Sequence, residues 1–132
     1  MEKFDDLLKK LDLEYFGNGR HKISFEKMME LKKENKVFII DVRTKEETEC
    51  LKIEFANNIP TDEIPDRINE IPKDKTIVVF CSSATRATIV FAYLQLHDYN
   101  DVKILLNSID EIAGFFKPGY VLKNSENLKN TN

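Results

Sequence analysis

The chain has 132 residues, of which 42% are hydrophobic and 33% are charged, and its formal net charge is −3. This length predicts one domain with a proper core, and the small net charge argues against nucleic acid or an anionic membrane as a partner. The N-terminal segment 1–10 is too polar for a secretory signal, and the longest apolar runs are too short to span a bilayer. We therefore expect a cytoplasmic protein with no nucleic-acid and no membrane partner.

Cysteine and histidine usage gives no sign of a metal centre. Cys50, Cys81, His21 and His97 show no metal-ligand spacing, so we expect no metal. In a reducing compartment the two cysteines are expected to be free thiols.

The first quarter of the chain predicts two helices. Residues 1–16 repeat apolar side chains at three- and four-residue steps, which is typical of an amphipathic helix, and 17–19 (Gly-Asn-Gly) end it. We interpret this helix as packing on the domain edge rather than as a partner-binding arm. Ser24 is a candidate N-cap for a second helix over 25–34, whose methionines are expected in the core.

A short apolar run over 37–40 ends at Asp41, which is typical of a strand buried on both faces of a parallel sheet. Residues 44–53 follow as a predicted helix, with acidic side chains in its first turns where the helix dipole favours them. A minimal strand is expected over 57–60 and a short helix over 62–70.

A second buried strand is predicted over 76–80, ending at Cys81. The β-branched residues of 85–96 favour a strand by propensity, but the length of the segment and the polar break before it favour a buried helix, which we predict. A strand over 102–106 and a helix over 108–116 complete the pattern.

Strands alternate with helices along the whole chain. This alternation predicts an α/β fold with an open parallel sheet, helices on both faces and right-handed crossovers. We divide the chain into an N-terminal helix and turn (1–20), the α/β domain (21–122) and a polar tail (123–132) that we expect to be disordered.

Ligands of parallel α/β sheets bind at the carboxyl ends of the strands. Backbone amides of a short loop there, together with the start of the following helix, can converge on one anion. Such surroundings favour the thiolate of Cys81, which makes it the candidate nucleophile, and the charge of Arg86 adds to the effect. Small side chains are expected to keep the loop open. The candidate substrate-binding residues are Ser82, Ser83, Ala84, Thr85 and Arg86.

Each of these assignments has a simpler alternative. Cys81 alone would be interpreted as an inert core cysteine, but its C-x4-R setting reverses that preference. Cys50 is interpreted as structural, or as a thiol that resolves an oxidised or persulfidated Cys81. Asp41 and Arg43 are either an ion pair at a strand end, with Glu46 or Glu47 as further partners, or a pair in which Arg43 tunes the field at the site.

Two segments together resemble the rhodanese-like domain, over residues 21–122. One is Ile39-Ile40-Asp41-Val42-Arg43 with Glu46-Glu47, and the other is the strand and loop from Val78 to Ala87. Matches at Ala56, Asn58, Ile59, Pro60 and in 104–109 extend the resemblance.

The resemblance implies a five-stranded parallel core and a sulfurtransferase. Its cysteine would take a sulfane sulfur from a small sulfur-containing anion such as thiosulfate, or from a persulfide, and pass it to a thiol or protein acceptor. No cofactor is implied.

The chain departs from the family pattern at several positions. Ala84 stands where the family often has glycine, and if that position needs a positive φ, alanine costs roughly 1–2 kcal/mol. Ser82 replaces a basic residue that accompanies thiosulfate use, which predicts a weak grip on thiosulfate. Further departures are Leu51-Lys52-Ile53, Asn107-Ser108 and Ile112.

Two other functions compete with sulfur transfer. Phosphatases and arsenate reductases of this fold hold five residues between cysteine and arginine, whereas only four stand between Cys81 and Arg86, and no acid is placed to protonate a leaving alcohol. The second rival is a non-catalytic module for sulfur sensing or protein docking; the altered positions, especially Ala84, leave this alternative open, and the intact nucleophile argues against it.

Overall fold

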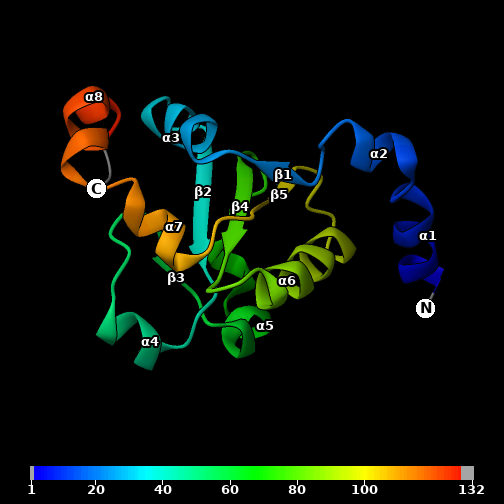
Figure 1. Ribbon diagram of the computed structural model, residues 1–132. Helices are drawn as coiled ribbons and strands as arrows, with labels where there is room; N and C mark the ends of the chain where they lie inside the picture. Colours follow the sequence, from blue (N-terminus) through cyan, green and yellow to red (C-terminus); the bar gives the residue numbers. More distant parts are fainter. Residues whose placement is uncertain (1, 129–132) are drawn as a thin grey trace.

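A computed structural model describes residues 2–128 and contains one five-stranded sheet in the order β1-β5-β4-β2-β3 (Figure 1). All neighbouring strands are parallel. The predicted α/β fold with a five-stranded parallel sheet is therefore confirmed. The strands are β1 (Lys22–Ile23), β2 (Val37–Asp41), β3 (Asn57–Asn58), β4 (Thr76–Phe80) and β5 (Val102–Leu105).

Helices cover both faces of the sheet, as predicted (Figure 1). Helices α3 and α7, with α8 beside them, pack on one face, and α5 and α6 pack on the other. The helices are α1 (Glu2–Lys10), α2 (Leu13–Gly17), α3 (Phe25–Lys33), α4 (Lys45–Cys50), α5 (Ile64–Arg67), α6 (Thr85–Leu96), α7 (Ile109–Gly114) and α8 (Pro118–Leu128), and 3-10 turns over Thr61–Glu63 and Ile68–Glu70 flank α5.

The central strand β4 is covered on both faces, which explains why its sequence is apolar at successive positions. Ile77 and Val79 point into the core under α6, while Val78 and Phe80 point into the core under α3 and α7. All four are at most 1% exposed. Successive residues of a strand face opposite sides, so a strand covered on both faces needs apolar side chains at every position. Met28 and Met29 of α3 lie in the second core, as expected.

The N-terminal segment forms two helices where one was predicted. Asp12 interrupts the helix because its Oδ1 accepts a hydrogen bond from the Tyr15 backbone N–H at 3.0 Å, which makes Asp12 the N-cap of α2. Leu7 of α1 is buried and α1 contacts α6, as expected for a helix packed on the domain edge.

The C-terminal segment differs from the prediction of a disordered tail over 123–132. Helix α8 continues to Leu128 with a kink at Asn124, so the prediction is wrong for residues 123–128, and 129–132 lie outside the described residues. The Asn124 side-chain amide donates to the Tyr120 carbonyl oxygen at 3.0 Å. Tyr120 in turn packs edge-on against Phe115, at 5.1 Å between ring centroids, which ties the start of α8 to the body of the fold.

Smaller differences concern element boundaries. The helix predicted over 44–53 ends at Cys50, because Leu51 takes an extended conformation (φ −149°, ψ 97°) and turns its carbonyl toward Arg43. The edge strand β1 was not predicted, because two residues are too few to show the alternating apolar pattern of a strand. No helix within residues 2–128 is long and apolar enough to cross a membrane.

Candidate active site

The loop that begins at Cys81 lies at the carboxyl edge of the sheet, next to the segment that follows β2. Strands β2 and β4 pair in parallel with Asp41 opposite Phe80. The Val42 N–H also donates to the Phe80 carbonyl oxygen at 3.0 Å, one residue before Cys81. The carboxyl ends of β2 and β4 are therefore neighbours.

The start of α6 faces the sulfur of Cys81. The Ala87 backbone N–H donates to Cys81 Sγ at 3.4 Å, from the first turn of a helix that begins at Thr85. Unpaired N–H groups and the dipole of this twelve-residue helix place positive potential at its N-terminus. The sulfur thus lies where a negative charge is stabilised.

The thiol is nevertheless covered. Cys81 is 1% exposed and belongs to the core under α6, whereas Ser83 and Thr85 are exposed on the outside of the loop. The expectation that small side chains keep the loop open is therefore wrong for this conformation. In this conformation the Cys81 side chain is therefore almost closed to solvent. Cys50, by contrast, is a free thiol exposed at the end of α4, and Cys81 is also free.

Ala84 occupies the left-handed region of backbone conformations, with φ 82° and ψ −21°. It is the N-cap residue of α6, and its carbonyl oxygen accepts hydrogen bonds from the N–H and the Oγ1 of Thr88, both at 2.9 Å. The loop therefore does require a positive φ at the position where the chain has alanine rather than glycine. That conformation costs a residue with a Cβ roughly 1–2 kcal/mol.

Arg86 is held by a carboxylate that the sequence analysis did not assign to it. Its Nη1 and Nη2 donate to Glu47 Oε1 and Oε2 at 2.6 and 3.0 Å, and Nη2 also donates to Ser82 Oγ at 3.0 Å. The Arg86 hydrogen bonds, with help from Thr44, lower the pKa of Glu47 to about 2. The same contact to Glu47 raises the pKa of Arg86. The nearby Cys81 and Asp41 raise this pKa further, by smaller amounts.

Asp41 and Arg43 form the ion pair expected at the strand end, but Glu47, named as a possible further partner of this pair, binds Arg86 instead. Both are buried, and Arg43 Nη2 lies 2.7 Å from Asp41 Oδ2 while Nε lies 3.0 Å from Oδ1. Arg43 Nη2 also donates to the Leu51 carbonyl oxygen at 2.8 Å. Asn58, which sequence reasoning did not connect with this pair, donates to the carbonyl oxygens of Asp41 and Arg43, both at 2.9 Å. The pair thus fastens the chain around the carboxyl end of β2.

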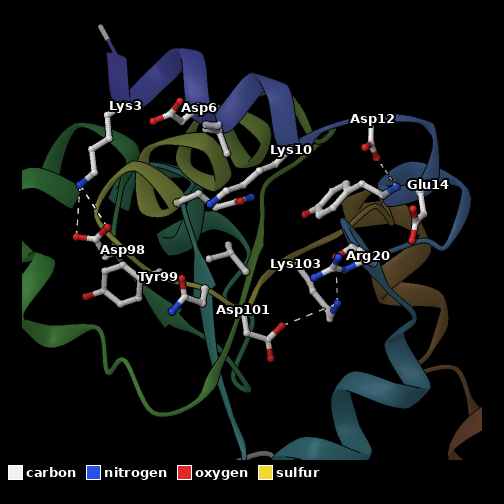
Figure 2. Close-up of a pocket in the computed structure, with 15 residues that line it drawn as sticks. Lys3, Asp6, Lys10, Asp12, Glu14, Arg20, Asp98, Tyr99, Asp101 and Lys103 are labelled. Atoms are coloured by element: carbon white, nitrogen blue, oxygen red, sulfur yellow. Dashed lines mark hydrogen bonds and ion pairs between the residues drawn. The ribbon is translucent and has the colours of Figure 1, made fainter.

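A cavity of about 660 Å³ lies elsewhere, between the N-terminal helices and the segment that leads into β5 (Figure 2). Residues 98–102 line it at the amino end of that strand, the edge of the sheet opposite Cys81. Figure 2 shows Lys3 paired with Asp98 and Lys103 with Asp101 at its rim. Cys81 does not line this cavity, so it is not part of the candidate site.

Residues 24–114 match the family model of the rhodanese-like domain, and the chain belongs to this family. A sulfurtransferase from Allochromatium vinosum is 37% identical over 73 residues, which cover 55% of this chain and 68% of that protein. A human single-domain sulfurtransferase has the same fold, with a TM-score of 0.64 at 19% identity, and the alignment covers 73% of this chain and 97% of that chain.

A NAD-dependent persulfide reductase from A. fulgidus is 29% identical, with a TM-score of 0.55 over 72% of this chain and 16% of that longer chain. The relatives place the chain among rhodanese-like proteins related to sulfurtransferases.

Proposed function

We propose that the protein transfers a sulfane sulfur through a persulfide on Cys81. The Cys81 thiolate attacks the outer sulfur of a donor, the donor's sulfur–sulfur bond breaks, and its electron pair leaves with the remainder of the donor. An acceptor thiolate then attacks the outer sulfur of the Cys81 persulfide, which yields an acceptor persulfide and returns the Cys81 thiolate.

The observation that carries this proposal is the Ala87 N–H directed at Cys81 Sγ from the start of α6. A backbone donor and a helix N-terminus both favour a negatively charged sulfur, whether it is the thiolate or, one atom further out, the persulfide. The family relationship to sulfurtransferases supports the same chemistry.

Intact mass spectrometry tests the proposal. The reduced protein is incubated with thiosulfate and, separately, with a low-molecular-weight persulfide, beside the variants Cys81→Ser and Cys50→Ser. We expect a gain of one sulfur atom in the wild type and in Cys50→Ser, reversed by cyanide, and none in Cys81→Ser. Sulfur carried by Cys81→Ser, or by no form of the protein, would contradict the proposal.

The burial of Cys81 supports a second candidate, a non-catalytic module for sulfur sensing or docking. The exposed Cys50 provides an internal reference for reactivity, because each single-cysteine variant retains only one thiol. If Cys81 alkylates at neutral pH far more slowly than Cys50 and takes no sulfur, the module is the better description. Reaction of Cys81 at a rate equal to or above that of Cys50 favours the transferase.

A further inference from the structure

Between Cys81 and Ala87 the one formally charged side chain is that of Arg86, which lies in the first turn of α6. Both terminal nitrogens of this guanidinium are bound to the carboxylate of Glu47, and one of them also binds Ser82 Oγ. A bidentate pair of this kind is a strong and specific arrangement. The net charge of Arg86 and Glu47 together is zero.

The second arginine at this edge of the sheet is also neutralised. Arg43 is buried against Asp41, at 2.7 Å between Nη2 and Oδ2. Each guanidinium at the carboxyl ends of β2 and β4 therefore has its own carboxylate. The helix dipole and the backbone amides remain as sources of positive potential, and they supply partial charges only.

We propose that Glu47 sets the donor preference of the site, because it cancels the charge of Arg86 and so disfavours dianionic donors such as thiosulfate relative to monoanionic organic donors. This inference rests on the proposed sulfur transfer at Cys81. Glu47 is a specificity-determining residue that acts through Arg86 and takes no part in the displacement at sulfur.

Two donors that differ mainly in charge separate this effect from others. Thiosulfate carries two negative charges and releases sulfite when Cys81 takes its outer sulfur. Methanethiosulfonate carries one negative charge and releases methanesulfinate by cleavage of the same kind of bond. In both reactions the charges balance, and the product on the protein is the Cys81 persulfide.

The test compares second-order rate constants of persulfide formation in wild type and Glu47→Gln. Glutamine keeps a side-chain oxygen for Arg86 and for the Thr44 N–H, which Glu47 binds at 3.1 Å, so the start of α4 is retained. Because an electrostatic free energy scales with donor charge, we expect roughly a tenfold gain for thiosulfate and roughly a threefold gain for methanethiosulfonate. Loosening of the loop would raise both rates equally, so the ratio of the two gains isolates the charge effect.

Glu46→Gln is the matched control, because Glu46 lies on the same helix, is exposed, and loses the same formal charge. We expect less than a twofold change for either donor. Ionic strength gives an independent readout. In the wild type, added potassium chloride is expected to speed the reaction with thiosulfate, since a thiolate beside a neutral pair repels a dianion, and Glu47→Gln should reduce that dependence.

Ser82→Lys provides a second variant that leaves Glu47 unchanged. It adds a cation to the loop and should also raise the rate with thiosulfate more than the rate with methanethiosulfonate. Equal gains with both donors in Glu47→Gln, or gains matched by Glu46→Gln, would overturn the inference while sulfur transfer stands. A wild type that takes sulfur from neither donor nor from a persulfide would overturn the proposed function and this inference with it.

Discussion

Replacing Ala84 by glycine should stabilise the protein. Ala84 holds φ at 82°, a conformation that costs a residue with a Cβ roughly 1–2 kcal/mol and glycine almost nothing. Glycine also gains freedom in the unfolded chain, which removes about 0.4–1 kcal/mol of that benefit. The expected net gain in the free energy of unfolding is therefore about 0.5–1 kcal/mol, or about 2–4 °C in Tm.

Urea unfolding followed by circular dichroism measures this difference, with Ala92→Gly as the control. Ala92 lies inside α6, where glycine should instead lower the free energy of unfolding by about 1 kcal/mol. Opposite signs for the two substitutions would confirm the reasoning. A loss of stability in Ala84→Gly would show that the loop does not carry the strain that its backbone angle implies.

Three further predictions concern side-chain contacts. Asp41→Asn leaves the buried Arg43 without its counter-charge and should lower the free energy of unfolding by about 3 kcal/mol in urea titrations. The pKa of Glu47 is lowered from 4.5 to about 2, so its contribution to stability is complete above pH 4.5 and is lost as the pH falls toward 2. Because Glu47 is partly exposed, wild type should lose only about 1 kcal/mol relative to Glu47→Gln over that range, measured by urea unfolding at each pH. Tyr99→Phe removes the hydroxyl that donates to the Ile71 carbonyl oxygen at 2.7 Å and should cost about 1–2 kcal/mol by thermal unfolding, and no change would mean that water replaces this contact.

The helix α6 illustrates what could be predicted from the sequence. Its β-branched residues favour a strand, yet the segment is a helix because its length and the loop before it outweigh local propensity. Ala87, Val90, Phe91 and Leu94 are buried at helical spacing. Ile89 on the other side is 59% exposed, so the amphipathic pattern is hidden by an apolar residue that faces outward. The strands β2 and β4 could be predicted for a simpler reason, because burial on both faces requires continuous apolar runs in the sequence.

The partner of Arg86 could not be predicted from local pattern. Glu47 lies 39 positions away, and the two meet only because β2 and β4 are neighbours in the sheet. The burial of Cys81 likewise depends on how α6 packs across the strand ends. The break at Asp12 is different, because an aspartate three residues before Tyr15 is an N-cap signal that a long apolar period concealed.

Strain at Ala84 and burial of Cys81 have opposite effects on access to the sulfur. Packing of the loop and the hydrogen bond from Arg86 to Ser82 favour the covered conformation, whereas the positive φ of Ala84 makes that conformation less stable. If Ala84 leaves its positive φ when the loop moves, release of the strain lowers the free energy of opening by roughly 1 kcal/mol. Glycine at this position has no such strain to release, so the free energy of opening rises by the same amount. Ala84→Gly should then alkylate at Cys81 about fivefold more slowly, with Cys50 unchanged as the reference in the same protein. An alanine in place of glycine would thus make a covered thiol easier to reach, and a faster reaction in the glycine variant would show that opening does not pass through a relaxed residue 84.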